Sequence, residues 1–146
     1  MKDLSLEEYR SLAEFRYQIR RFLGFSEEQV RAAGMEPQQH QLLLAVKGLP
    51  DEARATIGEL AERLQLKHHS TVELVNRLEK LGYVAREGSN RDRRQVMVHL
   101  THSGAKILRT LSIAHHQELE IAGPRLGKAL RSIARQHGVK KRSAAA

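Results

Sequence analysis

The stretch TIGELAERLQLKHHSTVELVNRLEKL, residues 56–81, decides the fold of this 146-residue chain. Its first half places apolar residues at helical spacing, and Thr56 with Glu59 matches a capping box at the helix start. A short turn at residues 65–67 separates this helix from a second one, which Gly82 closes. Two short helices joined by such a turn predict a helix-turn-helix, whose second helix can enter the major groove of DNA.

The second helix has an apolar side and a polar side. Val72, Val75 and Leu78 supply the side that we expect to be buried. The candidates for contacting DNA from this helix are His68, His69, Ser70, Thr71, Glu73, Asn76 and Arg77. An ordinary helical hairpin shows the same pattern, so these residues alone leave DNA binding open.

A predicted β-hairpin follows directly. Residues 83–86 and 95–100 favour strands, and the charged, turn-rich residues 87–94 lie between them. The candidates for contacting DNA at its tip are Arg91, Asp92, Arg93 and Arg94. Exposed arginines can enter a minor groove or hold phosphates, and Asp92 can keep one of them extended. A helix-turn-helix followed by a basic hairpin predicts a winged helix, which is a more specific pattern than either part.

Long helical segments flank this region. Residues 5–34 and 102–137 carry apolar stripes at spacings of three and four, around a winged region at residues 37–101. The basic, Ala-rich residues 138–146 are expected to be disordered. The fold class is therefore mainly α with a small β-hairpin (α+β), a winged helix-turn-helix with flanking dimerisation helices. We see no linker that would separate domains.

Local signals subdivide the flanking helices. Ser5 and Glu8 match a capping box at the start of the first one. Ser26 and Gln29 match a second cap, which predicts an interruption there. The pair Gly123-Pro124 predicts the end of one helix before a last helix begins.

The apolar stripes also bear on assembly. The flanking helices carry more apolar side chains than a small core requires, among them Leu12, Leu119 and Leu130. A two-fold dimer would cover them and would set two recognition helices about 34 Å apart, one turn of DNA. The alternative is that these helices simply pack within one chain.

Composition narrows the class of protein further. Lys and Arg number 25 against 17 Asp and Glu, giving a formal net charge of +8 that favours polyanions such as nucleic acid or anionic membrane. No apolar run approaches the ~18 residues of a membrane span, and no apolar signal segment begins the chain. We therefore expect a cytoplasmic protein without a membrane partner. No Gly-rich phosphate loop, nucleophile elbow or spaced carboxylate pair is present, so we expect no enzyme and no cofactor.

Several of these segments resemble the MarR family of bacterial regulators. The resemblance is carried by residues 56–64 (TIGELAERL), 70–72 (STV), 78–84 (LEKLGYV), 92–94 (DRR) and 100–104 (LTHSG), and it covers nearly the whole chain. It implies a homodimer built from the first and last helices, bound to a pseudo-palindromic operator in double-stranded DNA. It also implies repression of nearby genes, relieved by a small aromatic effector. Some family members respond to oxidants through cysteine, but this chain has no Cys and cannot respond in that way.

The resemblance also implies roles for individual residues. His69 and Glu73 match positions that read base edges, and Ser70 and Arg77 match positions that hold phosphates. Arg94 matches the minor-groove arginine, and Asp92 its orienting partner.

Two positions depart from the family pattern. The resemblance also implies three residues that bind an effector. Lys67 stands where a capping Ser or Asp is frequent, and Glu73 stands where an arginine is frequent. The polar lining of an effector pocket is implied at Arg16, Arg20 and His40.

Two other functions remain as alternatives. A winged helix can serve protein assembly, without salt-dependent DNA binding. The eight histidines suggest a metal sensor. The adjacent pairs at residues 68–69 and 115–116 point about 100° apart on a helix, however, so neither chelates alone and no metal site is assigned.

Overall fold

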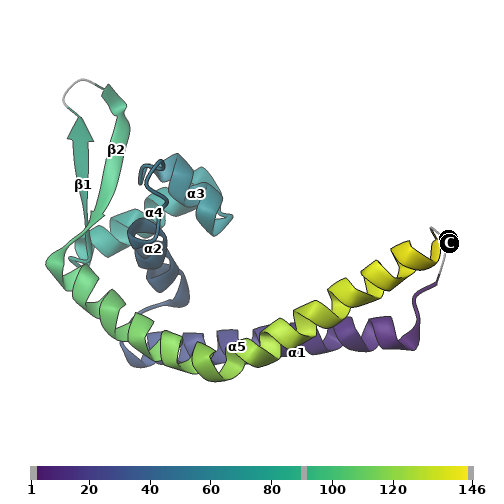
Figure 1. The fold of residues 1–146 in the computed structure, drawn as a ribbon. Coiled ribbons are helices and arrows are strands. Elements are labelled where there is room, and N and C mark those ends of the chain that lie inside the picture. Colours follow the sequence, from purple (N-terminus) through teal and green to yellow (C-terminus); the bar gives the residue numbers. More distant parts are fainter. Residues whose placement is uncertain (1–2, 90–91, 145–146) are drawn as a thin grey trace. The chain divides into compact units, whose positions relative to one another are not determined.

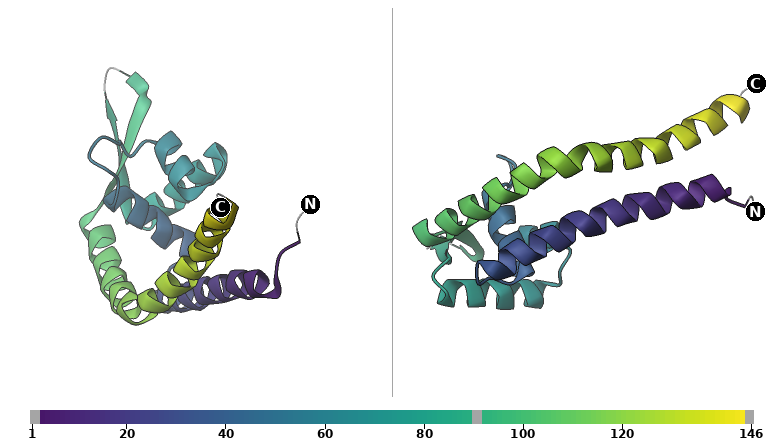
Figure 2. Two further views of the ribbon diagram at one scale, coloured as in Figure 1. Left: turned by 45° about the vertical axis from the view of Figure 1, so that its right-hand side comes forward. Right: turned by 90° about the horizontal axis from the view of Figure 1, so that it is seen from below.

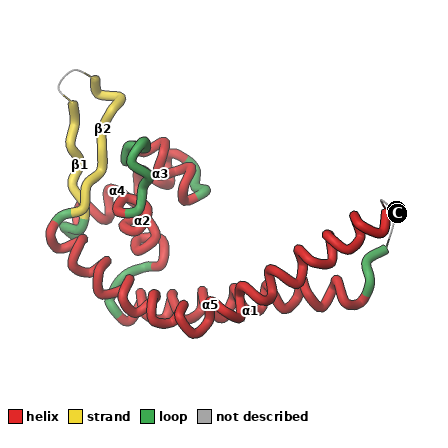
Figure 3. The backbone as a smooth tube through the Cα atoms, viewed as in Figure 1, coloured by secondary structure: helices red, strands yellow, loops and turns green. Residues whose placement is uncertain are grey.

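A computed structural model describes residues 3–89 and 92–144, with side chains described at 3–88 and 96–136. It is mostly helical with one antiparallel hairpin, as the sequence predicts (Figures 1 and 3). The elements are α1 (Leu6–Ala32), α2 (Pro37–Lys47), α3 (Ile57–Leu64), α4 (His68–Lys80), β1 (Val84–Ser89), β2 (Asp92–Leu100) and α5 (His102–Ala144). They form two compact units. Unit 1 comprises Met1–Glu28 and Ala114–Ala146, and unit 2 comprises Gln29–Ile113.

Unit 2 is built around one apolar core. Every element that enters the unit contributes a buried side chain, so the helix-turn-helix and the hairpin share one core. The core residues are Val30, Met35, Leu42, Leu43, Leu60, Leu74, Val75, Leu78, Val84, Val98, Leu108 and Leu111. Fully burying one such side chain contributes about 1.5–3 kcal/mol, so this shared core holds the hairpin against the helices.

Local capping sets the helix boundaries as predicted. The Thr56 hydroxyl accepts from the Glu59 backbone N–H at 3.2 Å and begins α3. Gly34 and Gly82, both at φ +80°, follow α1 and α4 in the left-handed conformation that glycine adopts without strain. The Ser5–Glu8 capping box is formed in both directions, at 2.7 and 3.3 Å.

The hairpin is tied to the helix-turn-helix through its backbone. Val98 N–H donates to the Ala55 carbonyl at 2.9 Å, and Thr56 forms a bridge with Met97. The register pairs Val84 with Leu100 and is irregular between Glu87 and Ser89. Both strands run further toward the tip than predicted, to residues 89 and 92, because the ladder continues past this irregularity.

Unit 1 pairs the first part of α1 with the last part of α5, and Figure 2 shows the two segments running alongside each other. The Ser11 hydroxyl lies 3.4 Å from that of Ser132, and Gln136 donates to it at 3.0 Å. At the other end, His115 is buried, with its Nε2 2.6 Å from the Ser26 hydroxyl. The rings of Phe22 and Phe25 lie edge-on to His115.

Two predictions about these helices are wrong. Helix α1 is not interrupted at Ser26, because that side chain bonds His115 rather than a backbone N–H. Helix α5 continues through Pro124, although proline removes one helical hydrogen bond. The contacts of Ser132 and Gln136 with α1 are made by the part beyond Pro124, and they favour continuation. The backbone of residues 138–144 belongs to α5, and the expected disorder of residues 138–146 stays a prediction.

Candidate nucleic-acid interface

The outer face of α4 is polar and exposed. His69, Glu73 and Asn76 are spaced by four and three residues, which places them on one face of the helix. His68 and Arg77 are also exposed, whereas Ser70 is half-buried. The opposite face is the buried one. Six of the seven candidate residues on this helix therefore have a side chain at least partly open to a partner.

Thr71 is the exception and corrects the prediction. Its side chain is 0% exposed, and its hydroxyl donates to the Lys67 carbonyl at 3.0 Å. The buried stripe comprises Thr71, Leu74, Val75 and Leu78, whereas Val72 is only half-buried. The buried side is thus rotated toward Thr71 and Leu74, with Val75 and Leu78 buried as expected, and the Thr71 side chain lies away from the exposed face.

The start of α4 lacks a side-chain cap, as the lysine at position 67 predicts. Lys67 is the N-cap residue, and its side chain makes no capping hydrogen bond. The first backbone N–H groups of a helix lack partners within the helix and attract anions. An uncapped start next to Ser70 therefore leaves donors for a phosphate.

The wing candidates lie largely outside the described part of the chain. Arg91 is outside it altogether. The backbone of Asp92, Arg93 and Arg94 belongs to β2, but their side chains are not described. Their contacts with DNA stay a prediction.

A second set of polar contacts joins the hairpin to α4. The Arg86 guanidinium donates through Nη1 to Glu79 Oε1 at 3.0 Å and through Nη2 to Asn76 Oδ1 at 2.5 Å. The Arg86 backbone N–H also donates to Glu79 Oε2, at 3.2 Å. We call these three residues the Arg86 cluster. Strand alternation from Val84 and the three-residue spacing on α4 were the available signals for it, and the sequence prediction did not use them.

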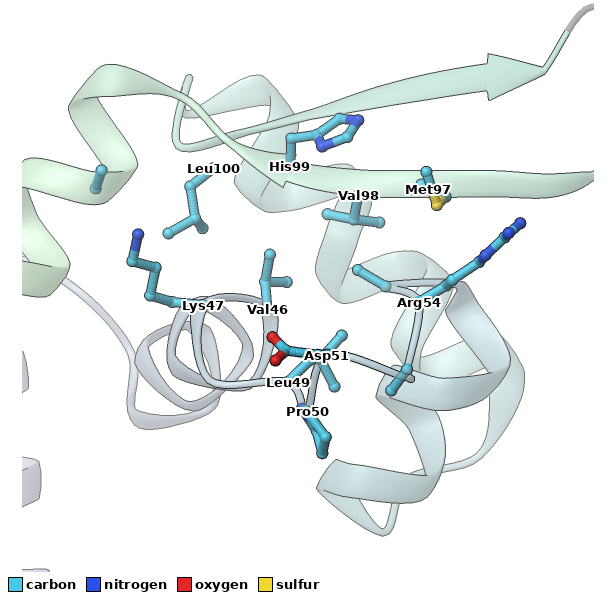
Figure 4. Close-up of a pocket in the computed structure, with 13 residues that line it drawn as sticks. Val46, Lys47, Leu49, Pro50, Asp51, Arg54, Met97, Val98, His99 and Leu100 are labelled. Atoms are coloured by element: carbon cyan, nitrogen blue, oxygen red, sulfur yellow. The ribbon is translucent and has the colours of Figure 1, made fainter.

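Cavities in unit 2 lie beside α2 rather than at the predicted effector residues. One of about 840 Å³ is bounded by α2, the following loop and β2, with Val46, Val98 and Leu100 on its walls and Asp51 among its polar groups (Figure 4). A second, of about 400 Å³, lies between α2 and α5. It is lined by Leu44, Lys47, Leu100, Ala105, Leu108, Arg109 and Ser112.

The residues predicted to line an effector pocket are not brought together in one unit. Arg16 and Arg20 belong to unit 1 and are exposed, whereas His40 is buried in unit 2. None of the three lines either cavity of unit 2. Their role in binding an effector stays a prediction.

Two of the histidines lie beside a glutamate. His99 Nε2 lies 2.6 Å from Glu87 Oε2, and His116 Nδ1 lies 3.6 Å from Glu120 Oε1. Within residues 3–89 and 92–144, no group of three or more His, Asp or Glu is placed to hold a metal ion. In the same residues, no helix combines the length and apolar character needed to cross a membrane.

The sequence of this chain is similar to those of known transcriptional regulators. A family model described as MarR family matches residues 33–95. The uncharacterized HTH-type transcriptional regulator YfiV of Bacillus subtilis (strain 168) is 34% identical over 98 residues, which cover 67% of this chain. The match spans only 59% of the length of YfiV.

Solved structures extend the likeness to most of the chain. Sco3205, a MarR family transcriptional regulator from Streptomyces coelicolor solved in complex with DNA, is 26% identical with a TM-score of 0.71, covering 94% of this chain and 90% of that one. AbsC, from the same organism, has a TM-score of 0.72 at 19% identity, covering 93% and 97%. AbsC supports the fold alone.

Proposed function

Because the chain belongs to the MarR family of transcriptional regulators, we propose that it binds specific double-stranded DNA and represses nearby genes as a homodimer. The observation that carries this proposal is the exposed polar face of α4, presented in the same compact unit as the hairpin. The relative Sco3205, solved with DNA, supports the same use of the fold. The protein acts in the cytoplasm, where its DNA lies, and has no enzymatic activity.

Each part of unit 2 has a physical role in this proposal. Helix α4 lies in a major groove, where His69 and Glu73 face base edges and Arg77 faces phosphate. The uncapped start of α4 adds backbone donors for another phosphate. Arg94 of the hairpin reaches the adjacent minor groove, held by Asp92. The net charge of +8 supplies the long-range attraction.

Dimerisation is supported by the exposed apolar side chains of unit 1. Leu6 is 64% exposed, Ile121 is 65% exposed and Leu130 is 53% exposed. Side chains of this kind favour burial by about 1.5–3 kcal/mol each. A second copy related by two-fold symmetry would cover them and would pair two copies of α4 with the two halves of a pseudo-palindrome.

We also propose that a small aromatic anion relieves the repression. The cavity between α2 and α5 has an apolar wall that includes Leu44 and Leu108, and it carries two cations, Lys47 and Arg109. No ion pair of either cation is found in the part of the chain whose side chains are described. The larger neighbouring cavity suits an anion less well, because Asp51 lies in its lining.

The effector proposal is tested with benzoate as the probe and benzyl alcohol as its neutral match. Benzoate should weaken DNA binding, and the double variant Lys47→Met with Arg109→Met should lose this response while still binding DNA. Equal responses to both probes, or an unchanged response in the double variant, would place the effector elsewhere.

DNA binding itself is tested by selecting genomic fragments with the purified protein and measuring fluorescence anisotropy on the recovered duplex. We expect binding that weakens steeply with salt and that exceeds binding to a scrambled duplex by at least about 10³-fold. Absence of duplex binding at low salt would instead favour the protein-assembly alternative.

A further inference from the structure

The Arg86 cluster lies where the hairpin meets the recognition helix. Arg86 shares its face of β1 with the buried Val84 and is paired across the hairpin with Val98. Its side chain therefore lies over α4, where it contacts Asn76 and Glu79. These contacts are made by one guanidinium and one backbone N–H, within unit 2.

The partner of Asn76 fixes the orientation of its amide. A guanidinium has five N–H donors and no acceptor, so the Asn76 oxygen must be the atom that faces it. The donor of this hydrogen bond is a charged guanidinium, which strengthens the bond relative to one between neutral groups. Because Asn76 is exposed, its NH2 group is left pointing away from Arg86, and no acceptor for it is found among the side chains described at 3–88 and 96–136.

We propose that Arg86 is a positioning residue for DNA recognition, which fixes the Asn76 amide with its NH2 group turned outward as a donor and cancels the charge of Glu79 on the recognition helix. This inference rests on the proposed function. Asparagine reads adenine by accepting from N6 and donating to N7, which needs its oxygen. With one lone pair of that oxygen engaged and the oxygen turned toward Arg86, Asn76 presents its NH2 group to a phosphate or to a base acceptor such as guanine O6 or N7.

Glu79 explains why the position needs an arginine. Its side chain is 42% exposed and stands on the helix proposed to approach the phosphates, where an unpaired negative charge would repel them. The two Glu79 oxygens accept from the guanidinium and from the Arg86 backbone N–H. Lysine supplies one point charge and no planar pair of donors, so Arg86→Lys cannot hold Asn76 and Glu79 together.

A double-mutant cycle on the selected duplex tests this inference. The variants are Asn76→Ala, Arg86→Met and the two combined, measured by anisotropy. If Arg86 acts through Asn76, we expect each single variant to weaken binding about fivefold to tenfold, and the double variant to be no weaker than Arg86→Met. Losses that multiply in the double variant would show that the two residues act independently, and would overturn the inference.

The salt dependence separates positioning from direct contact. A lost phosphate contact lowers the slope of log K against log salt by about 0.9, whereas a lost positioning contact leaves it near the wild-type value. Because Arg86→Met alone leaves the Glu79 charge unpaired, the slope is measured on Arg86→Met combined with Glu79→Gln, which removes both charges of the pair and should keep the wild-type slope. Arg63→Met is the matched control, because it removes another arginine paired to a glutamate at 3.0 Å in unit 2, and it should change affinity less than about threefold.

The variant Asn76→Asp should keep the stability of the fold but weaken the binding of DNA. The aspartate pairs with Arg86 and should keep the midpoint of thermal unfolding at or above that of the wild type, but it has no donor and should bind DNA at least about tenfold more weakly. Wild-type-like DNA binding by this variant would contradict the inference. If the wild-type protein itself fails to bind duplex DNA, the proposed function falls, and this inference with it.

Discussion

Gly104 offers a sharp test of how α5 joins the base of the hairpin. A Cβ at this position would lie 2.0 Å from the Tyr83 carbonyl oxygen and 2.9 Å from its carbon. Ordinary contact begins at 3.4 Å, so Gly104→Ala requires the two backbones to separate by about 1.4 Å. The same carbonyl accepts from Thr101 N–H at 3.1 Å, at the point where the hairpin begins.

We expect Gly104→Ala to destabilise the protein, whereas replacing glycine by alanine within a helix ordinarily stabilises it. Alanine gains up to about 1 kcal/mol over glycine within a helix. Forcing a methyl group into a closed site costs typically 1–3 kcal/mol, and more where backbone must move. We therefore expect Gly104→Ala to lower the free energy of unfolding by about 2 kcal/mol, which lowers the melting temperature by roughly 10 °C for a unit of this size.

Thermal and urea unfolding followed by circular dichroism measure this change. The matched control is Gly58→Ala in α3, where nothing lies within 4 Å of the added Cβ, and it should be neutral or slightly stabilising. If Gly104→Ala is as stable as the control, the close packing of α5 on Tyr83 is wrong.

Four further changes test other parts of the structure. Thr56→Ala removes the α3 cap and should lower the free energy of unfolding, measured by urea titration, by about 1 kcal/mol. An unchanged urea midpoint would contradict a stabilising role for this cap. Ser26→Ala removes the hydroxyl partner of the buried His115 and should lower the free energy of unfolding by about 1–3 kcal/mol, and an unchanged unfolding midpoint would contradict a stabilising role for this bond. Ile121→Glu should convert the proposed dimer to a monomer of 16.6 kDa in light scattering, and a mass that stays at twice this value would remove Ile121 from the interface. Arg94→Ala should lower the salt slope of DNA binding by about one unit, and a wild-type slope would refute the wing contact.

Features fixed by neighbouring residues were predictable from the sequence. The caps at Ser5 and Thr56 and the turn at Gly82 depend on chain neighbours only, and all are formed. The alternation around Val84 and Val98 likewise predicted the hairpin. The exposed polar residues of α4 followed from helical periodicity, apart from the rotation that buries Thr71.

Features decided by distant contacts were not predictable. Ser26 and Gln29 match a capping box, but the partner of Ser26 is His115, 89 residues away. Pro124 carries a local signal to end a helix, which contacts between the two ends of the chain override. The Arg86 cluster joins a strand to a helix, and only the packing of one on the other reveals that Asn76 and Arg86 meet.

The central claim is that two copies of α4 and the hairpin are presented together to duplex DNA. Hydroxyl-radical footprinting on the genomically selected duplex tests it most directly. The account predicts two protected half-sites centred about 10 base pairs, or ~34 Å, apart, related by two-fold symmetry. A single protected half-site, or protection without that spacing, would contradict it.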